Sequence, residues 1–205
     1  SLESQINIKE NEKNKFQLNL NSALKENEKL LNENQKLEEE LKKEKEAVEV
    51  QKRKISEIES NGNNIINSYE KLLSALDEYE KGDFVSSAFI LIHEVKAEYL
   101  ENDGLKKYNE LVEKTFSKAA HTLYKDGLDL YRNDQYDEAV EKFNKSLEIS
   151  DSEYFSDDCL YLSAYARYNQ GNKEDALSYY RELLNKYPDS NYAKNSEIIL
   201  KKLEN

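Results

Sequence analysis

The sequence predicts an all-α protein: a long N-terminal coiled-coil helix, then a short array of helical hairpins and a C-terminal capping helix. Three observations predict this class. Apolar residues in the first 60 positions recur every three or four residues. Only 5 Gly and 1 Pro occur, and 35% of the residues are charged, which is typical of long helices facing water. Beyond residue 68 the pattern changes to helix, short turn, helix.

Residues 1–60 follow a heptad repeat with Leu30 at position d, flanked by Glu and Lys. A helix with so narrow an apolar stripe buries it best against another such helix. At about 1.5 Å per residue, the segment would form a rod roughly 90 Å long. The predicted oligomer interface consists of Leu20, Asn27, Leu30, Asn34, Leu37, Leu41, Val48 and Ile55.

Two asparagines in this heptad repeat indicate how the helices pair. Asn27 and Asn34 fall at successive a positions, where each can pair with its own copy in a parallel, in-register dimer. We therefore expect a parallel homodimer. A trimer is the first alternative, and a helix that folds back on its own repeat domain is the second.

Residues 61–67 are predicted to be a hinge between the coiled coil and a domain spanning residues 68–205. The run Asn61-Gly62-Asn63-Asn64 contains poor helix formers. The heptad register nevertheless continues past it, through Ile65, Tyr69, Leu72 and Leu76. The alternatives are a kink or a frayed helix at the same place.

Residues 120–151 form the clearest hairpin unit. Gly127 in the first helix leaves room for a close neighbour, and Ala139 and Phe143 follow at helical spacing in the second. This pattern resembles the tetratricopeptide repeat, whose small residue in the first helix and Ala-x-x-x-aromatic in the second are matched here. The resemblance implies packed helix pairs in which Phe143 fills the space against the neighbouring helix.

Other segments extend this resemblance. Residues 156–190 form a second unit with Ala164, Ala176 and Tyr180, and the 37-residue offset from Ala139 to Ala176 predicts about three extra residues near 151–156. Residues 68–101 form a weaker unit, and residues 191–205 are predicted to cap the array. The run from Tyr187 to Ala193, with a preceding coiled coil, resembles the bacterial periplasmic cell-division coordinators associated with the Tol–Pal system.

The resemblance also implies a ligand groove, because in this family the first helix of each repeat lines a concave surface. Aromatic side chains there offer broad apolar contact and a hydroxyl group, which suits a peptide. Packing between helices is the alternative role for each of them. The candidate peptide-binding groove consists of Tyr124, Leu128, Tyr131, Tyr161, Tyr165 and Tyr168.

The distribution of charge along the chain indicates which classes of binding partner are favoured. Residues 1–60 hold 14 acids and 12 bases; the remaining residues hold the other 28 acids and 18 bases, a net charge of −10. This part should repel nucleic acid and anionic membrane surfaces and favour a neutral or basic protein or peptide. No segment has the roughly 18 consecutive apolar residues of a membrane span.

The sequence offers no catalytic or metal-binding constellation. His93 and His121 lie in different helical units without a partner at metal-ligand spacing, and Cys159 has no second cysteine. We expect Cys159 to be a small core residue. We therefore expect no enzyme activity and no cofactor.

The predicted function is a non-enzymatic adaptor, whose coiled coil oligomerises and spaces while its groove binds a protein or peptide. The alternatives are a structural spacer without a groove ligand, and an accessory domain of a larger protein. The sequence opens at Ser1 without Met. We expect a bacterial extracytoplasmic protein, anchored to a membrane through a segment before Ser1, with the cytoplasm as the alternative.

Overall fold

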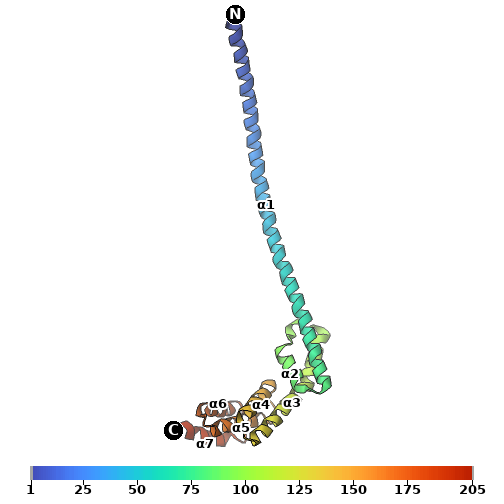
Figure 1. Ribbon diagram of the computed structural model, residues 1–205, viewed down its shortest axis with the longest axis vertical. Helices are drawn as coiled ribbons and strands as arrows, with labels where there is room; N and C mark the ends of the chain where they lie inside the picture. Colours follow the sequence, from blue (N-terminus) through green and yellow to red (C-terminus); the bar gives the residue numbers. More distant parts are fainter. Residues whose placement is uncertain (1, 205) are drawn as a thin grey trace. The chain divides into compact units, whose positions relative to one another are not determined.

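The computed structural model describes residues 2–204, which fold into α-helices joined by short turns and one 3-10 turn. The elements are α1 (Leu2–Lys81), α2 (Phe84–His93), the 3-10 helix η1 (Ala97–Tyr99), α3 (Asn102–Arg132), α4 (Tyr136–Ile149), α5 (Ser156–Asn169), α6 (Lys173–Lys186) and α7 (Ala193–Glu204) (Figure 1). This confirms the predicted all-α class and the long N-terminal helix. No helix within residues 2–204 combines the length and the apolar character needed to cross a membrane.

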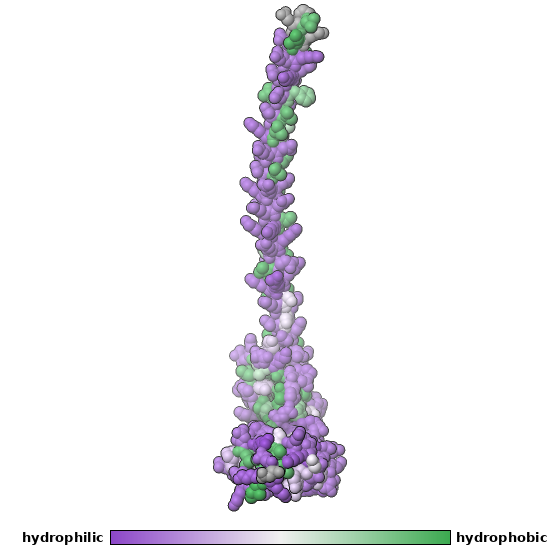
Figure 2. Space-filling view, turned by 90° about the vertical axis from the view of Figure 1, so that its left-hand side faces the viewer, coloured by the Kyte–Doolittle hydropathy of each residue, from purple (hydrophilic) through white to green (hydrophobic). Residues whose placement is uncertain are grey.

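The chain divides into two compact units, one ending at Asn61 and one beginning at Gly62. We call residues 2–61 the rod and residues 62–204 the repeat domain. In the rod every side chain from Ile6 to Asn61 is exposed, the apolar ones of the heptad repeat included. Green apolar patches recur among polar side chains along this helix in Figure 2.

At residues 61–67, where a hinge is expected, α1 continues without a break, and the boundary between the two compact units falls at the start of this segment. A methyl group added at Gly62 would meet no atom within 4 Å, so neither close packing nor an unusual backbone angle requires glycine there. A poor helix former inside a long helix costs about 1 kcal/mol or less. That cost is too small to interrupt a helix that already has several turns on both sides.

Past Gly62 the apolar face of α1 packs inside the repeat domain. Leu72 and Ala75 are buried in a cluster with Leu91 of α2 and Leu111 of α3, and Tyr69 packs against its edge. Gly104 at the start of α3 lies under Tyr69, where an added Cβ would come within 2.5 Å of the tyrosine hydroxyl. The last five turns of α1 therefore serve as the first helix of the repeat domain.

Three helical hairpins in the repeat domain share one turn geometry. Gly82, Asp134 and Gly171 connect α1 to α2, α3 to α4 and α5 to α6, with φ values of +85°, +59° and +77°. Each donates its backbone N–H to the carbonyl three residues earlier, and the next residue donates to the carbonyl five residues before itself. This pair of hydrogen bonds is the Schellman motif, which ends a helix with a residue in the left-handed backbone conformation. Residues 68–101 thus contain the same kind of hairpin as the two clearer units.

The hairpins pack as the small-residue pattern predicts. Ala139, Phe143, Ala164, Ala176 and Tyr180 are fully buried. A Cβ on Gly127 would lie 2.6 Å from the Phe143 ring, so only glycine allows this approach of α3 to α4. The extra residues between the two clear units form the loop between α4 and α5.

The C-terminal helix α7 covers the last hairpin. Ile199, Leu200 and Leu203 pack against the cluster of Ala164, Ala176 and Tyr180. This is the capping contact expected for residues 191–205; residue 205 lies outside the described range. The cap buries an apolar face that would otherwise remain in water.

Candidate peptide-binding groove

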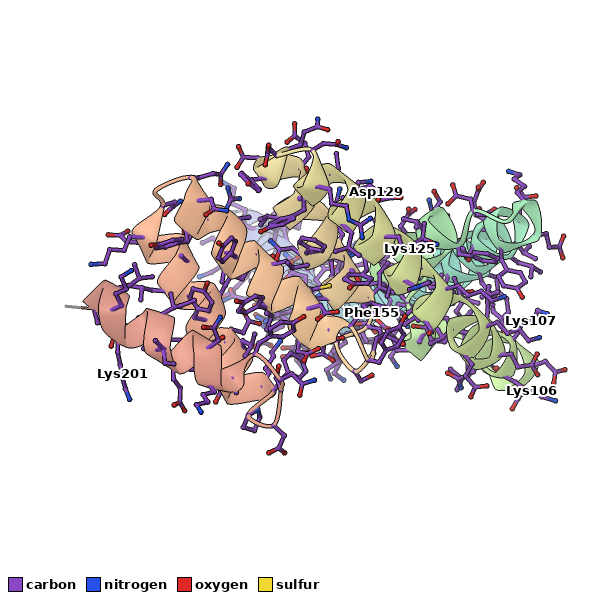
Figure 3. All side chains as sticks on the ribbon, turned by 90° about the horizontal axis from the view of Figure 1, so that it is seen from below. Lys106, Lys107, Lys125, Asp129, Phe155 and Lys201 are labelled. Atoms are coloured by element: carbon purple, nitrogen blue, oxygen red, sulfur yellow. The ribbon has the colours of Figure 1, made fainter. Side chains whose placement is uncertain are left out.

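Helices α3 and α5 place the candidate groove residues on neighbouring faces. Spacings of three and four residues put Tyr124, Leu128 and Tyr131 on one face of α3, and Tyr161, Tyr165 and Tyr168 on one face of α5. The helices between and beside them, α4 and α6, are their partners in the two hairpins. Figure 3 shows these helices side by side, with Lys125 and Asp129 on α3.

At one end of this surface, the ring and the hydroxyl of Tyr124 both contact other side chains of the same chain. Its ring stacks on Phe155, with centroids 4.6 Å apart, and its hydroxyl donates to Asp158 Oδ2 at 2.8 Å. Burial and this hydrogen bond to a carboxylate raise the pKa of Tyr124. Leu128 is half-buried and packs against the same cluster as Phe143. Both side chains therefore stabilise the fold. This agrees with the alternative role considered for the groove residues, which is packing between helices.

Tyr161 is covered by the segment that leads into α7. Its ring stacks on Tyr192 with centroids 4.2 Å apart, and its hydroxyl accepts a hydrogen bond from Asn195 Nδ2 at 2.6 Å. A hydrogen bond to Asp158, with burial, raises the pKa of Tyr192 to about 12. The C-terminal segment thus closes the surface beside Tyr161.

Of the remaining tyrosines, Tyr131 on α3 is half-buried, whereas Tyr165 and Tyr168 on α5 are exposed. Tyr165 and Tyr168 are each 38% exposed, and their ring centroids are 6.3 Å apart. Tyr165 continues to Tyr161 at 6.4 Å. On α3, Tyr131 packs edge-on against Tyr136 at 5.4 Å, and burial, with the neighbouring phenols, raises the pKa of Tyr131 to about 12.

A buried hydroxyl lies among these rings. Tyr180 of α6 is fully buried, and its hydroxyl has no hydrogen-bond partner within residues 2–204. Burial raises the pKa of Tyr180, and the phenols that add to this effect include Tyr131, Tyr161 and Tyr165. Tyrosines from four helices therefore meet here; we call this set the tyrosine cluster: Tyr131, Tyr136, Tyr161, Tyr165, Tyr168 and Tyr180.

Charged groups beside the tyrosine cluster are already engaged. Arg167 pairs with Asp137 and donates to Gln170 Oε1 at 2.8 Å. The guanidinium holds the pKa of Asp137 below its ordinary value. The carboxylate of Asp134 accepts a hydrogen bond from the Tyr136 hydroxyl at 2.9 Å. The open surface is therefore aromatic and hydroxyl-bearing rather than ionic.

Sequence reasoning missed Tyr136 and Tyr192 as parts of this surface. Tyr136 begins α4, on the second helix of its hairpin, whereas the family pattern pointed only to first helices. Tyr192 lies between α6 and α7, where only a cap was expected. The signal available was the abundance of tyrosine, 15 of 205 residues, with several in this half of the chain.

The predicted oligomer interface lies entirely on the exposed face of the rod. Leu20 is 58% exposed, Leu37 56% and Ile55 55%. Asn27 and Asn34 occupy the same helix and are exposed as well. In the single chain these side chains remain exposed to water, and their role as an oligomer interface stays a prediction.

The residues considered for chemistry have structural surroundings. Cys159 is fully buried, and this burial raises the pKa of its thiol to about 12. The Nε2 atom of His93 lies 2.9 Å from Glu148 Oε1, and His121 packs against Tyr124, Tyr154 and Phe155. Within residues 2–204, no three His, Cys, Asp or Glu side chains are grouped so as to hold a metal ion.

Comparison with known families identifies one repeat. Residues 158–190, which cover most of α5 and all of α6, match the family model of the tetratricopeptide repeat. Such repeats generally serve as protein–protein interaction modules. A search of curated protein sequences finds no match for the chain. The match supports the tetratricopeptide resemblance at the hairpin that carries Tyr161, Tyr165 and Tyr168.

Proposed function

We propose that this protein is a non-enzymatic adaptor: its rod self-associates as a parallel dimer, and its tyrosine cluster binds an extended segment of a partner protein. The observation that carries the proposal is the open part of the cluster, in which Tyr165 and Tyr168 stay 38% exposed on the hairpin that matches the tetratricopeptide repeat. Partly exposed aromatics next to one another are the side chains that most often dominate binding energy in protein interfaces.

The rod supplies the second half of the proposal. Its apolar stripe is exposed over eight heptads, and Asn27 and Asn34 favour a parallel pairing in register. Two repeat domains in one dimer would present two copies of the tyrosine cluster. A partner with two binding segments would then be held more tightly through avidity than either cluster could hold it alone.

The test of the groove uses the full chain and a matched pair of variants. Tyr165→Ser with Tyr168→Ser removes the two most exposed rings of the cluster, whereas Tyr154→Ser removes a tyrosine that is 81% exposed in the loop before α5. The wild type and both variants are used to select binders from a random peptide library, after circular dichroism has shown equal helicity. We expect peptides bound by the wild type and the Tyr154 variant to be lost by the double variant.

A structural spacer without a groove ligand is the second candidate. One observation favours it: Tyr161 is already covered by Tyr192 and Asn195 of the same chain. The spacer predicts that the library selects nothing that depends on Tyr165 and Tyr168. That result would contradict the groove and leave the rod as the only interaction surface.

The bacterial envelope is the setting we propose for this adaptor. Its support is the resemblance of residues 187–193, after a long N-terminal helix, to coordinators of the Tol–Pal system. Fractionation of native cells with an antibody to the repeat domain tests the setting. Recovery in the cytosolic fraction alone would contradict it.

A further inference from the structure

The first and last helices of the repeat domain each keep apolar side chains exposed to water. On α1, Ile66 and Leu73 are 59% and 65% exposed, although the neighbouring Leu72 is buried in the core. On α7, Ile198 is 58% exposed, although the next residue, Ile199, packs against the last hairpin. The outer faces of terminal helices in repeat arrays are usually polar, because nothing else covers them. Both ends of this domain depart from that rule.

Acidic side chains accompany the apolar ones on α1. Glu70 follows Ile66 by four residues and Glu80 follows Leu73 by seven, spacings that place all four on one side of the helix. Both carboxylates are exposed, and within residues 2–204 neither forms an ion pair, whereas Asp77 on the same side is paired with a lysine of α1. We call Ile66, Glu70, Leu73 and Glu80 the acidic end.

Basic side chains accompany the apolar one on α7. Lys194 and Lys202 lie four residues before and after Ile198, on the same helix face. Both are exposed, and neither forms an ion pair within the part of the chain that the structure describes. Glu197 lies at the border of this face, which therefore keeps a net positive charge. We call Lys194, Ile198 and Lys202 the basic end.

The charges of the two ends determine which contact between copies is favoured. Two acidic ends in contact would bring Glu70 and Glu80 close to their own copies, and two basic ends would do the same with their lysines. Like charges placed opposite each other suppress such pairings. An acidic end against a basic end instead pairs carboxylates with ammonium groups, while each covers the exposed apolar side chains of the other.

The spacing on α1 also suits an apolar side chain from α7. Ile66, Tyr69, Glu70 and Leu73 are related as i, i+3, i+4 and i+7, the four positions that form a hole between side chains on a helix surface. A side chain such as Ile198 can enter a hole of this kind. The lysines one turn on either side of it then lie next to the carboxylates of the acidic end.

We propose that the repeat domain binds a second copy of itself head to tail, with the basic end of α7 docked on the acidic end of α1. The two surfaces in contact differ, so each pair leaves one acidic end and one basic end free, and the assembly can grow beyond two chains. The contact involves neither the tyrosine cluster nor the seam of the rod. Few apolar side chains are covered, so the association is weak and sensitive to salt.

Sedimentation velocity at rising protein concentration measures this association in the full chain. It is made on the wild type and on Leu30→Asp with Leu37→Asp, which removes pairing through the rod. In the rod variant we expect the mean mass to rise above 24.0 kDa with concentration at about 0.1 M salt. The rise should disappear at about 1 M salt, where the Debye length falls to about 3 Å.

This measurement separates the inference from the proposed dimer of the rod. A rod variant that stays at 24.0 kDa at every concentration would overturn head-to-tail association, whatever the wild type does. A wild type that starts from the single-chain mass at low concentration would contradict the rod dimer alone.

Charge reversal in the rod variant tests which surfaces meet. Glu70→Lys with Glu80→Lys makes the end on α1 basic, and Lys194→Glu with Lys202→Glu makes the end on α7 acidic. Each pair of changes should weaken the association at least about tenfold, because like charges then face each other. All four changes together restore opposite charges and should bring the association to within about threefold of the starting protein.

The matched control is Glu98→Lys with Glu113→Lys, which makes the same change in net charge at exposed positions of η1 and α3. It should leave the association nearly unchanged. Circular dichroism confirms that every variant keeps its helicity. Single-end variants that associate like the starting protein would overturn the inference, and so would a fourfold variant that does not recover.

Discussion

The two parts of α1 carry the same apolar spacing and use it in opposite ways. In the rod, the seam residues Leu30, Leu37 and Ile55 are all exposed. Past Gly62, Leu72 in the same heptad register is buried by α2 and α3 of its own chain. A heptad pattern therefore predicts a helix with one apolar face, but it does not tell whether a second chain or the same chain covers that face.

The comparison also limits where two chains can pair. Because Tyr69 and Leu72 contact the core of the repeat domain, those seam positions are not available to a second copy. We infer that the proposed coiled coil ends near Ile58, the last seam residue that the structure leaves largely exposed.

The largest effect is expected in the repeat domain, where packing is tight. Phe143→Ala should lower the free energy of unfolding by about 3–5 kcal/mol, because the ring is fully buried against Gly127 and leaves a cavity. Gly127→Leu should also destabilise the domain, since its side chain would overlap the Phe143 ring. Thermal and urea unfolding followed by circular dichroism measure both. Melting like that of the wild type would mean that the packing of α3 on α4 has been misread.

The matching substitution in the rod should change assembly while the repeat domain stays folded. Leu30→Asp with Leu37→Asp places two charges on the seam, where a dimer would bury them without partners. Light scattering of the wild type should give twice the 24.0 kDa chain mass, and the variant should give the chain mass. Lys36→Asp with Lys43→Asp changes residues off the seam and serves as the control. A wild type at the single-chain mass would contradict the dimer.

A smaller change concerns the choice of oligomer. Asn27→Ile with Asn34→Ile should stabilise the rod and make its association less selective between dimer and trimer, because isoleucine packs in either. Sedimentation equilibrium of wild type and variant measures the distribution of masses. A variant that remains entirely dimeric would show that these asparagines do not select the oligomer.

The sequence predicted those parts of the fold that depend on local patterns. The helices follow from the apolar spacing, whereas the burial of Ala139 and Phe143 and the extra residues before α5 follow from the resemblance to the tetratricopeptide repeat. Two features were missed, and each depends on tertiary contacts. The first is that residues 102–119 belong to the 31-residue helix α3. This extension depends on tertiary packing such as that of Gly104 on Tyr69.

The second miss concerns the candidate site. The covering of Tyr161 by Tyr192 depends on how the C-terminal segment returns to α5, which no local pattern encodes. The expected hinge at residues 61–67 stays a prediction: α1 is continuous there, because the helical turns on both sides outweigh the cost of one poor helix former. Sequence reasoning thus located the aromatic surface on α3 and α5, but not which of its tyrosines the fold itself would cover.

The smallest predicted effect compares one substitution at two glycines, one inside α1 and one in the turn that follows it. At Gly62 and Gly82 an added Cβ meets nothing within 4 Å, so Gly→Ala changes only the backbone preference. Gly62 lies inside a helix, where alanine is favoured by about 1 kcal/mol; Gly62→Ala should therefore stabilise α1. Gly82 has a φ of +85°, which alanine adopts at a cost of about 1–2 kcal/mol; Gly82→Ala should therefore destabilise the α1–α2 hairpin.

Opposite signs in this pair would distinguish a glycine that the helix merely tolerates from one that the turn requires. Thermal unfolding of the two variants, measured beside the wild type, gives both signs in one experiment. If Gly62→Ala destabilised the protein, residues 61–67 would need a non-helical conformation in solution, and the hinge expected from the Asn61-Gly62-Asn63-Asn64 run would regain support. If Gly82→Ala were neutral, the positive φ shared by Gly82, Asp134 and Gly171 would not be what holds the first hairpin in the geometry of the other two.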